Sequence, residues 1–262
     1  MLPVPPERLD RIRPLFAGFP GLHGALDAAF EGVYGDVFVN NIDDPRVARI
    51  VIGDFHCVAG DPDAPLAAET LRAVPDREYL AVPESWHPFV AATLPNAFPN
   101  NRFAFSAPDK WDRAHLASLV ASLADDYTLE RITTASVQEF EDLNETFVAN
   151  FKSHADYLAR GAGFGIRHNG RPGFVAGCSS YTISSSCLEF EIEAHREYQR
   201  RGLALVAGAR MVQHCLDNGL TPDWDAAWDG SADLADRLGF VGRRRYTAYR
   251  IGIPSGPPEV DG

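Results

Sequence analysis

The sequence predicts two domains that each contain helices and strands, an α/β fold of the α+β type. Its 262 residues are enough for one large domain or two ordinary ones, each with a sizeable core. Short strand-like and helix-like segments alternate along the whole chain. The alternation pauses near Asp125 and then starts again. We therefore expect a smaller, divergent α/β domain over residues 1–125 and a second domain over residues 126–262.

The composition excludes several classes of function. The formal charge is -12 and the pI is near 5.0, whereas a nucleic-acid partner requires a face of clustered lysine and arginine. The lysines, Lys110 and Lys152, do not lie in a phosphate-loop pattern, which excludes Walker-type nucleotide hydrolysis. No basic stretch followed by an apolar run opens the chain, and no run approaches the roughly 20 apolar residues of a membrane span. We expect a cytoplasmic protein with no nucleic-acid or membrane partner.

The cysteines and histidines do not predict a metal site. Cys57, Cys178, Cys187 and Cys215 form no CxxC pair, and the eight histidines show no HxxxH or HExxH spacing. The cysteines are typical of small buried residues in a reducing compartment. A disulfide between Cys178 and Cys187 across a hairpin is the less favoured alternative.

The first half predicts short elements separated by prolines and glycines. Residues 36–40 and 47–60 are rich in β-branched residues and flank the turn NIDDP, which indicates a hairpin. Further strands are expected at 77–82 and 102–106, and helices from Leu66, at 84–94 with an interruption near Pro88, and at 111–123.

The second half predicts a longer series of elements. A strand at 127–133 precedes an amphipathic helix at 136–148, with Ser136 as N-cap and Glu139 three residues on, the spacing of a capping box. Two or three antiparallel strands follow, with a turn at Asn169–Gly170. We then expect an apolar helix ending at Gly219, a strand at 222–228, a helix at 231–240 capped by Ser231, and a strand at 243–253.

The segment QRRGLA, Gln199–Ala204, joins the alternating strand LEFEIEA to the apolar helix. Such a turn places unpaired backbone N–H groups at a helix N-terminus, where the helix dipole favours an anion. Gly202 allows close approach of the backbone, Ala204 keeps the first turn small, and Arg200 and Arg201 offer charge to phosphate oxygens. The segment therefore predicts a pyrophosphate cradle.

This turn resembles motif A of the GCN5-related N-acetyltransferases (GNAT), whose pattern is Gln/Arg-x-x-Gly-x-Gly/Ala. The resemblance extends over about residues 127–253, to a bacterial subfamily in which the acetyltransferase domain follows a divergent N-terminal half. It is carried by four blocks, Glu191-Ile192, Tyr198–Ala204, Pro222–Ala226 and Ser231–Phe240. It implies the GNAT fold, a mixed and mostly antiparallel sheet flanked by helices, and leaves open that the first half is a degenerate copy of that fold.

The resemblance also implies acetyl-CoA as the acyl donor substrate. Its pantetheine arm would lie between the strands at 188–194 and 222–228 and pair with the backbone near Ala194. The acceptor would be a small-molecule amine or a protein amino group, and a homodimer stays open. The implied donor-binding residues are Ala194, His195, Gln199, Arg200, Arg201, Gly202, Leu203, Ala204 and Ser231.

Strand alternation supplies the candidate catalytic residues. Glu189, Glu191 and Glu193 point to one face of a regular strand, and acetyl transfer to an amine needs a base that takes a proton from the ammonium. Neighbouring carboxylates raise one another's pKa, which favours such a role. Glu191 is the first candidate because it lies in the matched Glu-Ile pair, and Glu193 is the second. A solvated strand face is an equally weighted alternative for any one of them.

Two positions depart from the family pattern. Trp228 and Ala235 stand where many acetyltransferases have an asparagine and the tyrosine that protonates the leaving thiolate. Tyr246, Tyr249 or water could replace that acid. The departure leaves open a second interpretation, a non-catalytic acyl-CoA-binding or scaffold protein.

Overall fold

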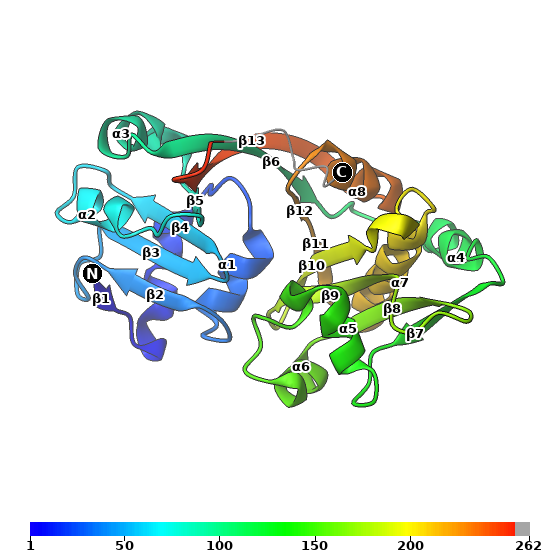
Figure 1. Cartoon of the computed structure of the whole chain (residues 1–262). Coiled ribbons are helices and arrows are strands. Elements are labelled where there is room, and N and C mark those ends of the chain that lie inside the picture. The colour runs from blue at the N-terminus through cyan, green and yellow to red at the C-terminus, as the bar shows by residue number, and fades with distance from the viewer. Residues whose placement is uncertain (255–262) are drawn as a thin grey trace. The chain divides into compact units, whose positions relative to one another are not determined.

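The structure is a computed structural model that describes residues 1–254 (Figure 1). The chain forms two compact units. The first comprises Met1–Ala104, Ala226–Asp229 and the segment from Arg244, and the second comprises Phe105–Asp225 and Gly230–Arg243. The sequence predicts a domain boundary between residues 125 and 126, whereas the packing groups residues 105–125 with the second unit and the end of the last strand with the first.

An eight-stranded sheet runs through the first unit in the order β1-β2-β3-β4-β5-β13-β6-β12. The predicted hairpin is confirmed, because β2 and β3 pair antiparallel, and a tight turn after Ile52 adds β4 to them. Strand β5 runs parallel to β4, and the last strand of the chain, β13, pairs antiparallel with β5. The strands are β1 (Leu2–Pro3), β2 (Asp36–Val39), β3 (Val47–Ile52), β4 (Phe55–Gly60), β5 (Tyr79–Ala81), β6 (Ala97–Ser106), β12 (Asp225–Ala226) and β13 (Val241–Ile251).

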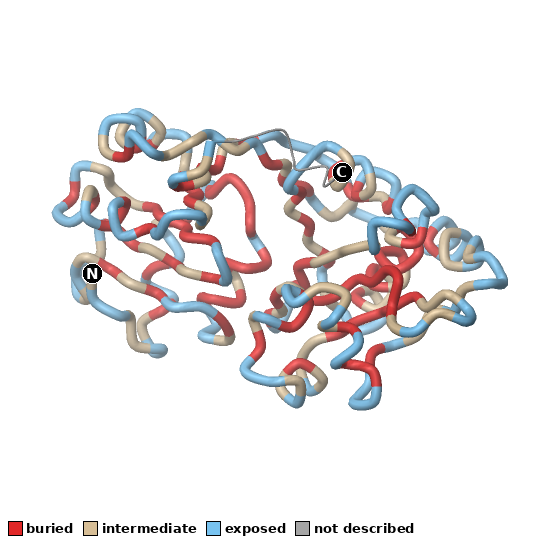
Figure 2. Tube along the Cα trace, viewed as in Figure 1, coloured by how far each residue is buried: buried red, intermediate tan, exposed pale blue. Residues whose placement is uncertain are grey.

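Short helices complete the first unit. They are α1 (His23–Phe30), α2 (Ala67–Arg72) and α3 (His87–Thr93), together with 3-10 turns at Pro6–Arg11, Arg13–Phe16 and Glu84–Trp86. Pro88 lies in the first turn of α3, where its missing N–H costs no helical hydrogen bond. One core cluster joins Leu71 of α2, Trp86, and Leu80 of β5 to Tyr249 of β13. The central strands are correspondingly buried (Figure 2).

The second unit is built on a five-stranded sheet in the order β11-β10-β9-β8-β7. Its strands pair antiparallel, except that β11 runs parallel to β10. The predicted turn at Asn169–Gly170 lies between β8 and β9, and Gly170 has a φ of 80°. The strands are β7 (Tyr127–Arg131), β8 (Gly163–His168), β9 (Ala176–Ile183), β10 (Cys187–Ala194) and β11 (Thr221–Asp223).

Helices cover both faces of this sheet. The apolar helix α7 (Leu203–Asp217) packs on β8, β9 and β10 and on α4 (Arg113–Ala121), and Gly219 after its C-terminus has a φ of 70°, as a glycine stop predicts. Helix α5 (Val137–Leu143) lies on the opposite face, where Phe140 contacts Gly177 of β9. Helices α6 (His154–Arg160) and α8 (Asp229–Leu238) complete the set.

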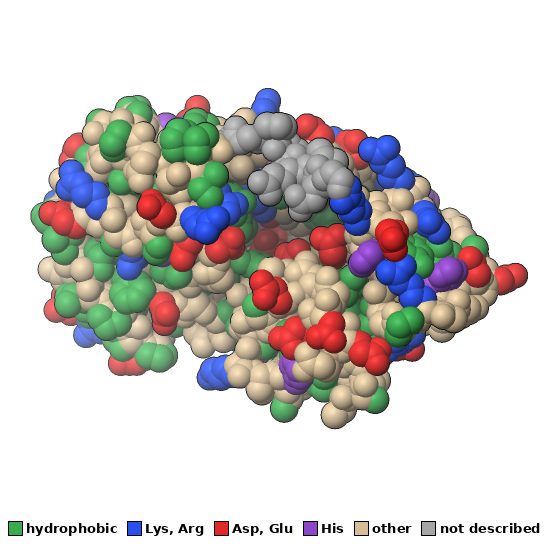
Figure 3. Space-filling model, in the orientation of Figure 1, with side chains coloured by type: hydrophobic (Ala, Val, Ile, Leu, Met, Phe, Trp, Pro, Cys, Tyr) green, Lys and Arg blue, Asp and Glu red, His purple; other side chains and the backbone are tan. Residues whose placement is uncertain are grey.

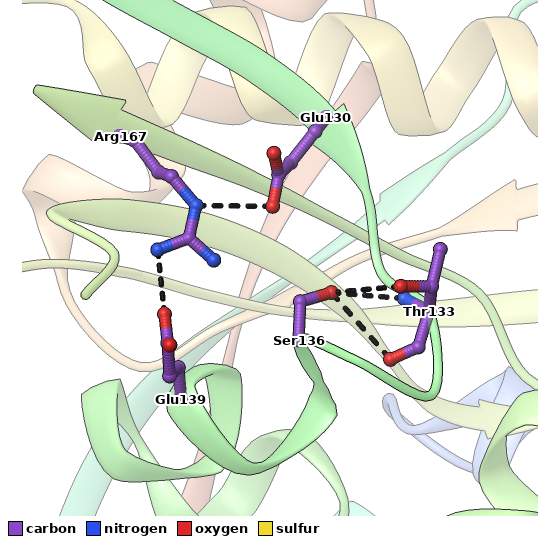
Figure 4. Close-up of polar contacts among 5 residues, drawn as sticks. All are labelled: Glu130, Thr133, Ser136, Glu139 and Arg167. Carbon is purple, nitrogen blue, oxygen red and sulfur yellow. Dashed lines mark hydrogen bonds and ion pairs between the residues drawn. The ribbon is translucent and has the colours of Figure 1, made fainter. Parts of the chain in front are cut away.

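The start of α5 differs from the predicted capping box (Figure 4). Helix α5 begins directly after Ser136, but the Ser136 hydroxyl accepts the N–H of Thr133 at 3.0 Å and caps no helical N–H. Glu139 pairs instead with Arg167 of β8 at 2.5 Å, and Arg167 also bonds Glu130 of β7 at 3.0 Å. The capping-box prediction was therefore wrong, and an ion-pair bridge fastens α5 to the sheet.

Two other predicted elements differ from the structure. The expected strand at 222–228 is divided at Trp224, so that β11 joins the second sheet and β12 the first. Helix α8 begins at Asp229, which makes Ser231 its third residue and not its N-cap. The four cysteines are buried and free, as the favoured interpretation predicts.

Candidate active site

Strand β10 has one edge that its neighbours only partly cover. Its pairing with β9 continues to Ala194, whereas its pairing with β11 ends at Glu189, opposite Asp223. Aromatic rings pack where the two strands part, with Phe190 5.6 Å from Trp224 and 6.1 Å from Phe240 between ring centroids. Residues 190–194 therefore present backbone groups that another extended chain could pair with.

The register of β10 and β9 decides which way the candidate glutamates point. Glu191 lies opposite Ser179 and Glu193 opposite Gly177, and directly opposed residues share a face of the sheet. That face is covered by α5 and the 3-10 turn Glu145–Phe147, because Phe140 contacts Gly177 and the Ser179 hydroxyl donates to the carbonyl of Phe147 at 2.6 Å. Glu191 and Glu193 thus share a face, as strand alternation predicts. The register between β10 and β9 shifts between Glu189 and Phe190, so the regular pattern predicted for all three glutamates does not extend to Glu189.

The other face of β10 is turned toward helix α7. Ile192 lies opposite Cys178, and its Cδ1 would be 3.4 Å from a Cβ placed on Gly208 of α7. The side chain of Glu191 therefore lies on the face of the sheet that α5 covers, and that of Ile192 lies on the face that α7 covers. Period-two alternation is maintained through this part of the strand.

The three glutamates differ in burial. Glu189 is buried, and Glu191 and Glu193 are half-buried. Burial raises the pKa of Glu193, while the N–H of Ala194, 2.8 Å from its carboxylate, acts in the opposite direction. The sequence predicts that repulsion between carboxylates would raise this pKa, but desolvation is the cause in the structure.

The predicted cradle forms the N-terminus of α7. Gly202 precedes the helix with a φ of 81°, and Arg200 also has a positive φ of 61°. No side chain caps α7, and its first helical hydrogen bond runs from Val206 N–H to the carbonyl of Gly202 at 3.1 Å. The N–H groups of residues 203–205 precede that bond and have no partner within the helix.

Space around Gly202 agrees with an anion site. A Cβ built on Gly202 meets nothing within 4 Å, so the space on that side of the glycine is open. The left-handed φ is the stronger reason for a glycine here, because most L-residues adopt it at a cost. Unpaired N–H groups at a helix N-terminus are a common binding site for anions.

Two side chains connect the cradle to the end of β10. Gln199 donates its side-chain amide N–H to the carbonyl of Ala194 at 3.4 Å. The Glu193 carboxylate accepts the backbone N–H of Ala194. His195, half-exposed, continues the strand by donating its N–H to Val175 at 2.8 Å. The predicted residues from Glu191 to Ala204 therefore form one continuous segment of the structure.

A cluster of aromatic and basic side chains supports this loop, and the sequence did not predict it. The guanidinium groups of Arg171 and Arg201 both pack on the buried ring of Tyr198, at 4.9 and 4.8 Å from its centroid. The Tyr198 hydroxyl bonds His168 at 2.9 Å, and Arg201 donates to the hydroxyl of Tyr127 at 3.3 Å. Tyr198 and Arg201 carried a signal in the sequence, since both lie in the matched block Tyr198–Ala204, whereas Tyr127, His168 and Arg171 carried none.

Arg171 and Arg201 differ in how their charge is balanced. Arg171 forms an ion pair with Glu197 at 2.8 Å, whereas the hydrogen-bond partner of Arg201 is the neutral hydroxyl of Tyr127. That hydrogen bond raises the pKa of Arg201. The charge of Asp126 acts on the pKa of Arg201 in the same direction. Arg201 is therefore positively charged beside the cradle, and it has acidic groups near it but no ion pair among the described residues.

Other residues singled out in the sequence lie elsewhere. Ser231 of α8 accepts a hydrogen bond from Trp224 Nε1 at 3.2 Å, and its role in donor binding stays a prediction. Ala235 is fully buried, whereas Trp228 is 55% exposed. Tyr246 and Tyr249, the predicted replacement acids, are buried in the first unit, where Tyr249 belongs to the core cluster.

Neither a metal site nor a membrane-spanning helix is present in residues 1–254. In this range, no group of three or more His, Cys, Asp or Glu side chains could hold a metal ion. None of the helices in the same range has the length and apolar character needed to cross a membrane.

Known proteins share this architecture. A family profile described as GNAT acetyltransferase matches residues 14–249. An uncharacterized N-acetyltransferase, YdfB of Bacillus subtilis, is 28% identical over 127 residues, which cover 47% of this chain and 48% of that protein. The match therefore spans about half the length of this curated relative.

Solved structures extend the similarity to nearly the whole chain. A GCN5-related N-acetyltransferase-like protein from Streptococcus suis matches with a TM-score of 0.83 and 26% identity, over 94% of this chain and 98% of the other. A tandem GNAT protein from the clavulanic acid biosynthesis pathway, 14% identical, shares the fold with a TM-score of 0.61 over 97% and 99% of the two chains. Since the family profile covers most of the chain, including residues of both units, the chain belongs to the GNAT acetyltransferase family.

Proposed function

We propose that the protein is an acyl-CoA-dependent N-acetyltransferase that transfers an acetyl group from acetyl-CoA to an amine. One observation carries the proposal. The uncovered edge of β10 leads, within a few residues, to the uncapped N-terminus of α7. A single segment thus offers backbone partners for an amide-containing arm and N–H donors for a diphosphate, the two recognition elements that coenzyme A requires.

Each part of the segment has a role in this proposal. The edge at residues 190–194 pairs with the pantetheine amides, near Ala194. The N–H groups from Arg200 to Ala204 bind the pyrophosphate, and Arg201 supplies a positive charge. The donor itself supplies an activated acetyl thioester.

Glu191 is the proposed general base, acting directly or through one water. It takes a proton from the acceptor ammonium, and the neutral amine nitrogen then forms a bond to the acetyl carbon. The carbon–sulfur bond breaks, and the nitrogen gives its second proton to water, which returns one to the thiolate. Ala235 offers no hydroxyl to the departing thiolate, so water is the proposed proton donor. Glu193 is the second candidate for the base.

The surface of α5 favours a cationic acceptor. Asp142 on α5 and Glu145 just after it are exposed, and acidic side chains gather over this region in Figure 3. Helix α5 covers the face of β10 that carries Glu191 and Glu193. A field of this sign attracts protonated amines, in small molecules or on proteins, and repels acidic ones.

A second candidate function is acyl-CoA binding without transfer, and Ala235 favours it. The buried methyl group at this position cannot protonate a leaving thiolate. The cradle serves this function equally well. In that case the protein would be a scaffold whose state depends on bound acyl-CoA.

A screen for acceptors separates the two candidates. The purified chain is mixed with acetyl-CoA and with polyamines, aminoglycosides, amino acids or peptides, and free thiol release is followed over time. Amine-dependent thiol release together with an acetylated product supports the transferase. Saturable coenzyme A binding without thiol release with any amine supports the scaffold, and absence of binding rejects both.

A further inference from the structure

We infer that Glu193 is a positioning residue that occupies the donor-binding edge of β10 and must release it when the donor binds. The inference rests on the proposed function, since it concerns the arm that would pair with this edge. It gives Glu193 a different role from the general base proposed for Glu191. The two carboxylates lie on the same face of one strand, two residues apart.

Backbone geometry shows which way the groups of Ala194 point. In a strand, successive residues direct their N–H and C=O groups to opposite sides. His195 donates its N–H to Val175, toward β9. The N–H and C=O of Ala194 therefore point away from β9, to the side from which β11 has diverged.

The N–H and the C=O of Ala194 are both hydrogen-bonded to nearby side chains. Glu193 accepts the Ala194 N–H at 2.8 Å, and Gln199 donates to the Ala194 carbonyl at 3.4 Å. An amide of the donor that pairs with Ala194 would form the same two hydrogen bonds. Donor binding and the Glu193 hydrogen bond therefore exclude one another.

Displacement has a consequence for the protonation of Glu193. Burial raises its pKa, and the Ala194 N–H and the nearby His195 lower it. When the donor takes the N–H, one of the groups that favour the charged carboxylate is lost, so the pKa rises further and protons are taken up.

The charged surroundings of Glu193 are few, which makes this proton uptake measurable. Phe140 and Phe147 pack on this face from α5 and the turn after it, and the Tyr157 hydroxyl bonds Ser179 at 2.9 Å. Burial raises the pKa of Tyr157, which therefore stays neutral below neutral pH. Glu191 on the same strand and His195 are the titratable neighbours that a control must address.

The test is calorimetric titration of the full chain with coenzyme A near pH 5.5, in two buffers of different ionisation enthalpy. The phosphate monoester of coenzyme A also titrates near this pH, so the difference between the wild type and Glu193→Gln reports on Glu193. Glu193→Gln keeps an oxygen for the Ala194 N–H but cannot titrate, so it should bind coenzyme A with a smaller proton uptake than the wild type, by a fraction of a proton. Glu193→Ala removes the competitor, and its affinity should rise by about three- to tenfold, the usual contribution of one net hydrogen bond.

Glu191→Gln and His195→Gln are the matched controls, since each removes a neighbouring titratable group and should leave the proton uptake of Glu193 in place. Far-ultraviolet circular dichroism confirms that each variant is folded. Equal proton uptake by the wild type and Glu193→Gln, or an uptake that a control variant lowers and Glu193→Gln does not, would overturn the inference alone. Absence of coenzyme A binding to the folded wild type would overturn the proposed function and the inference with it.

Discussion

Phe140 of α5 packs so closely on Gly177 of β9 that a Cβ on Gly177 would lie 2.4 Å from Cε2 of the ring. Gly177 is also the cross-strand partner of Glu193. The contact therefore sets how closely α5 approaches the candidate carboxylates. The glycine is required here by space, because any side chain would force the helix away from the sheet.

Gly177→Ala should destabilise the second unit by about 1 to 3 kcal/mol, the usual cost of overpacking a rigid core. Urea denaturation followed by fluorescence measures the loss. The same substitution is also made in a Phe140→Leu variant, which lacks the ring atoms that the new methyl group meets. The penalty of Gly177→Ala should be smaller in that background, and equal penalties in both would show that Phe140 is not the cause.

Glu191→Gln should lower kcat by about 10²- to 10⁴-fold if Glu191 is the general base. Affinity for acetyl-CoA should stay within a few-fold, because the substitution leaves the backbone edge and the cradle unchanged. The rising limb of the kcat/KM pH profile should vanish or move. Wild-type turnover with the same limb would make Glu191 an ordinary strand residue and Glu193 the next to test.

The first unit should lose stability as the pH falls below about 6.5, the usual pKa of an unfolded histidine. His56 of β4 is buried, its Nε2 bonds Glu78, and its Nδ1 has no partner among the residues described. Desolvation, with help from Arg49, lowers the pKa of His56 despite Glu78. The unfolded chain therefore binds the proton first, and stability falls from pH 6.5 toward the lower, folded pKa.

A comparison with His56→Gln isolates this effect. The slope of the unfolding free energy between pH 7 and pH 5.5 should be smaller in the variant, by at most about 1.4 kcal/mol per pH unit, the value for one proton. Asp54 affects the stability at lower pH. Burial raises its pKa, so the folded chain binds this proton more readily than the unfolded chain, and the protonation of Asp54 favours folding as the pH falls. Equal slopes in the two proteins would remove His56 as the source.

The glycine turn before α7 could be predicted from the sequence because all of its information is local, whereas its role as a pyrophosphate cradle stays a prediction. An alternating strand, a glycine and an apolar helical run are contiguous, and the left-handed φ of Gly202 is what such a junction needs. The Tyr198 cluster could not be predicted in the same way. Its members Tyr127, in β7, and His168 and Arg171, at the end of β8 and in the turn after it, are far from Tyr198 in the sequence, and only the folded sheet brings them to the ring.

The errors have equally specific causes. Ser136 can bond backwards to Thr133 as readily as forwards to the helix, and Arg167 draws Glu139 away from the capping position. Alternation over residues 222–228 indicates a strand but does not say which strand it pairs with. The division at Trp224 between two sheets therefore could not be predicted from the pattern. The pairing of β13 with β5 in the first sheet could not be predicted for the same reason.

The most direct test of the account is a calorimetric titration of the full chain with acetyl-CoA, comparing Gly202→Asp with Gly202→Asn. Both side chains tolerate the left-handed φ of 81° better than other residues, and the two differ by one negative charge. If the pyrophosphate lies on this turn, Gly202→Asn should bind within a few-fold of wild type and Gly202→Asp should lose about tenfold or more. Equal affinity of the two folded variants, at the wild-type value, would contradict the account.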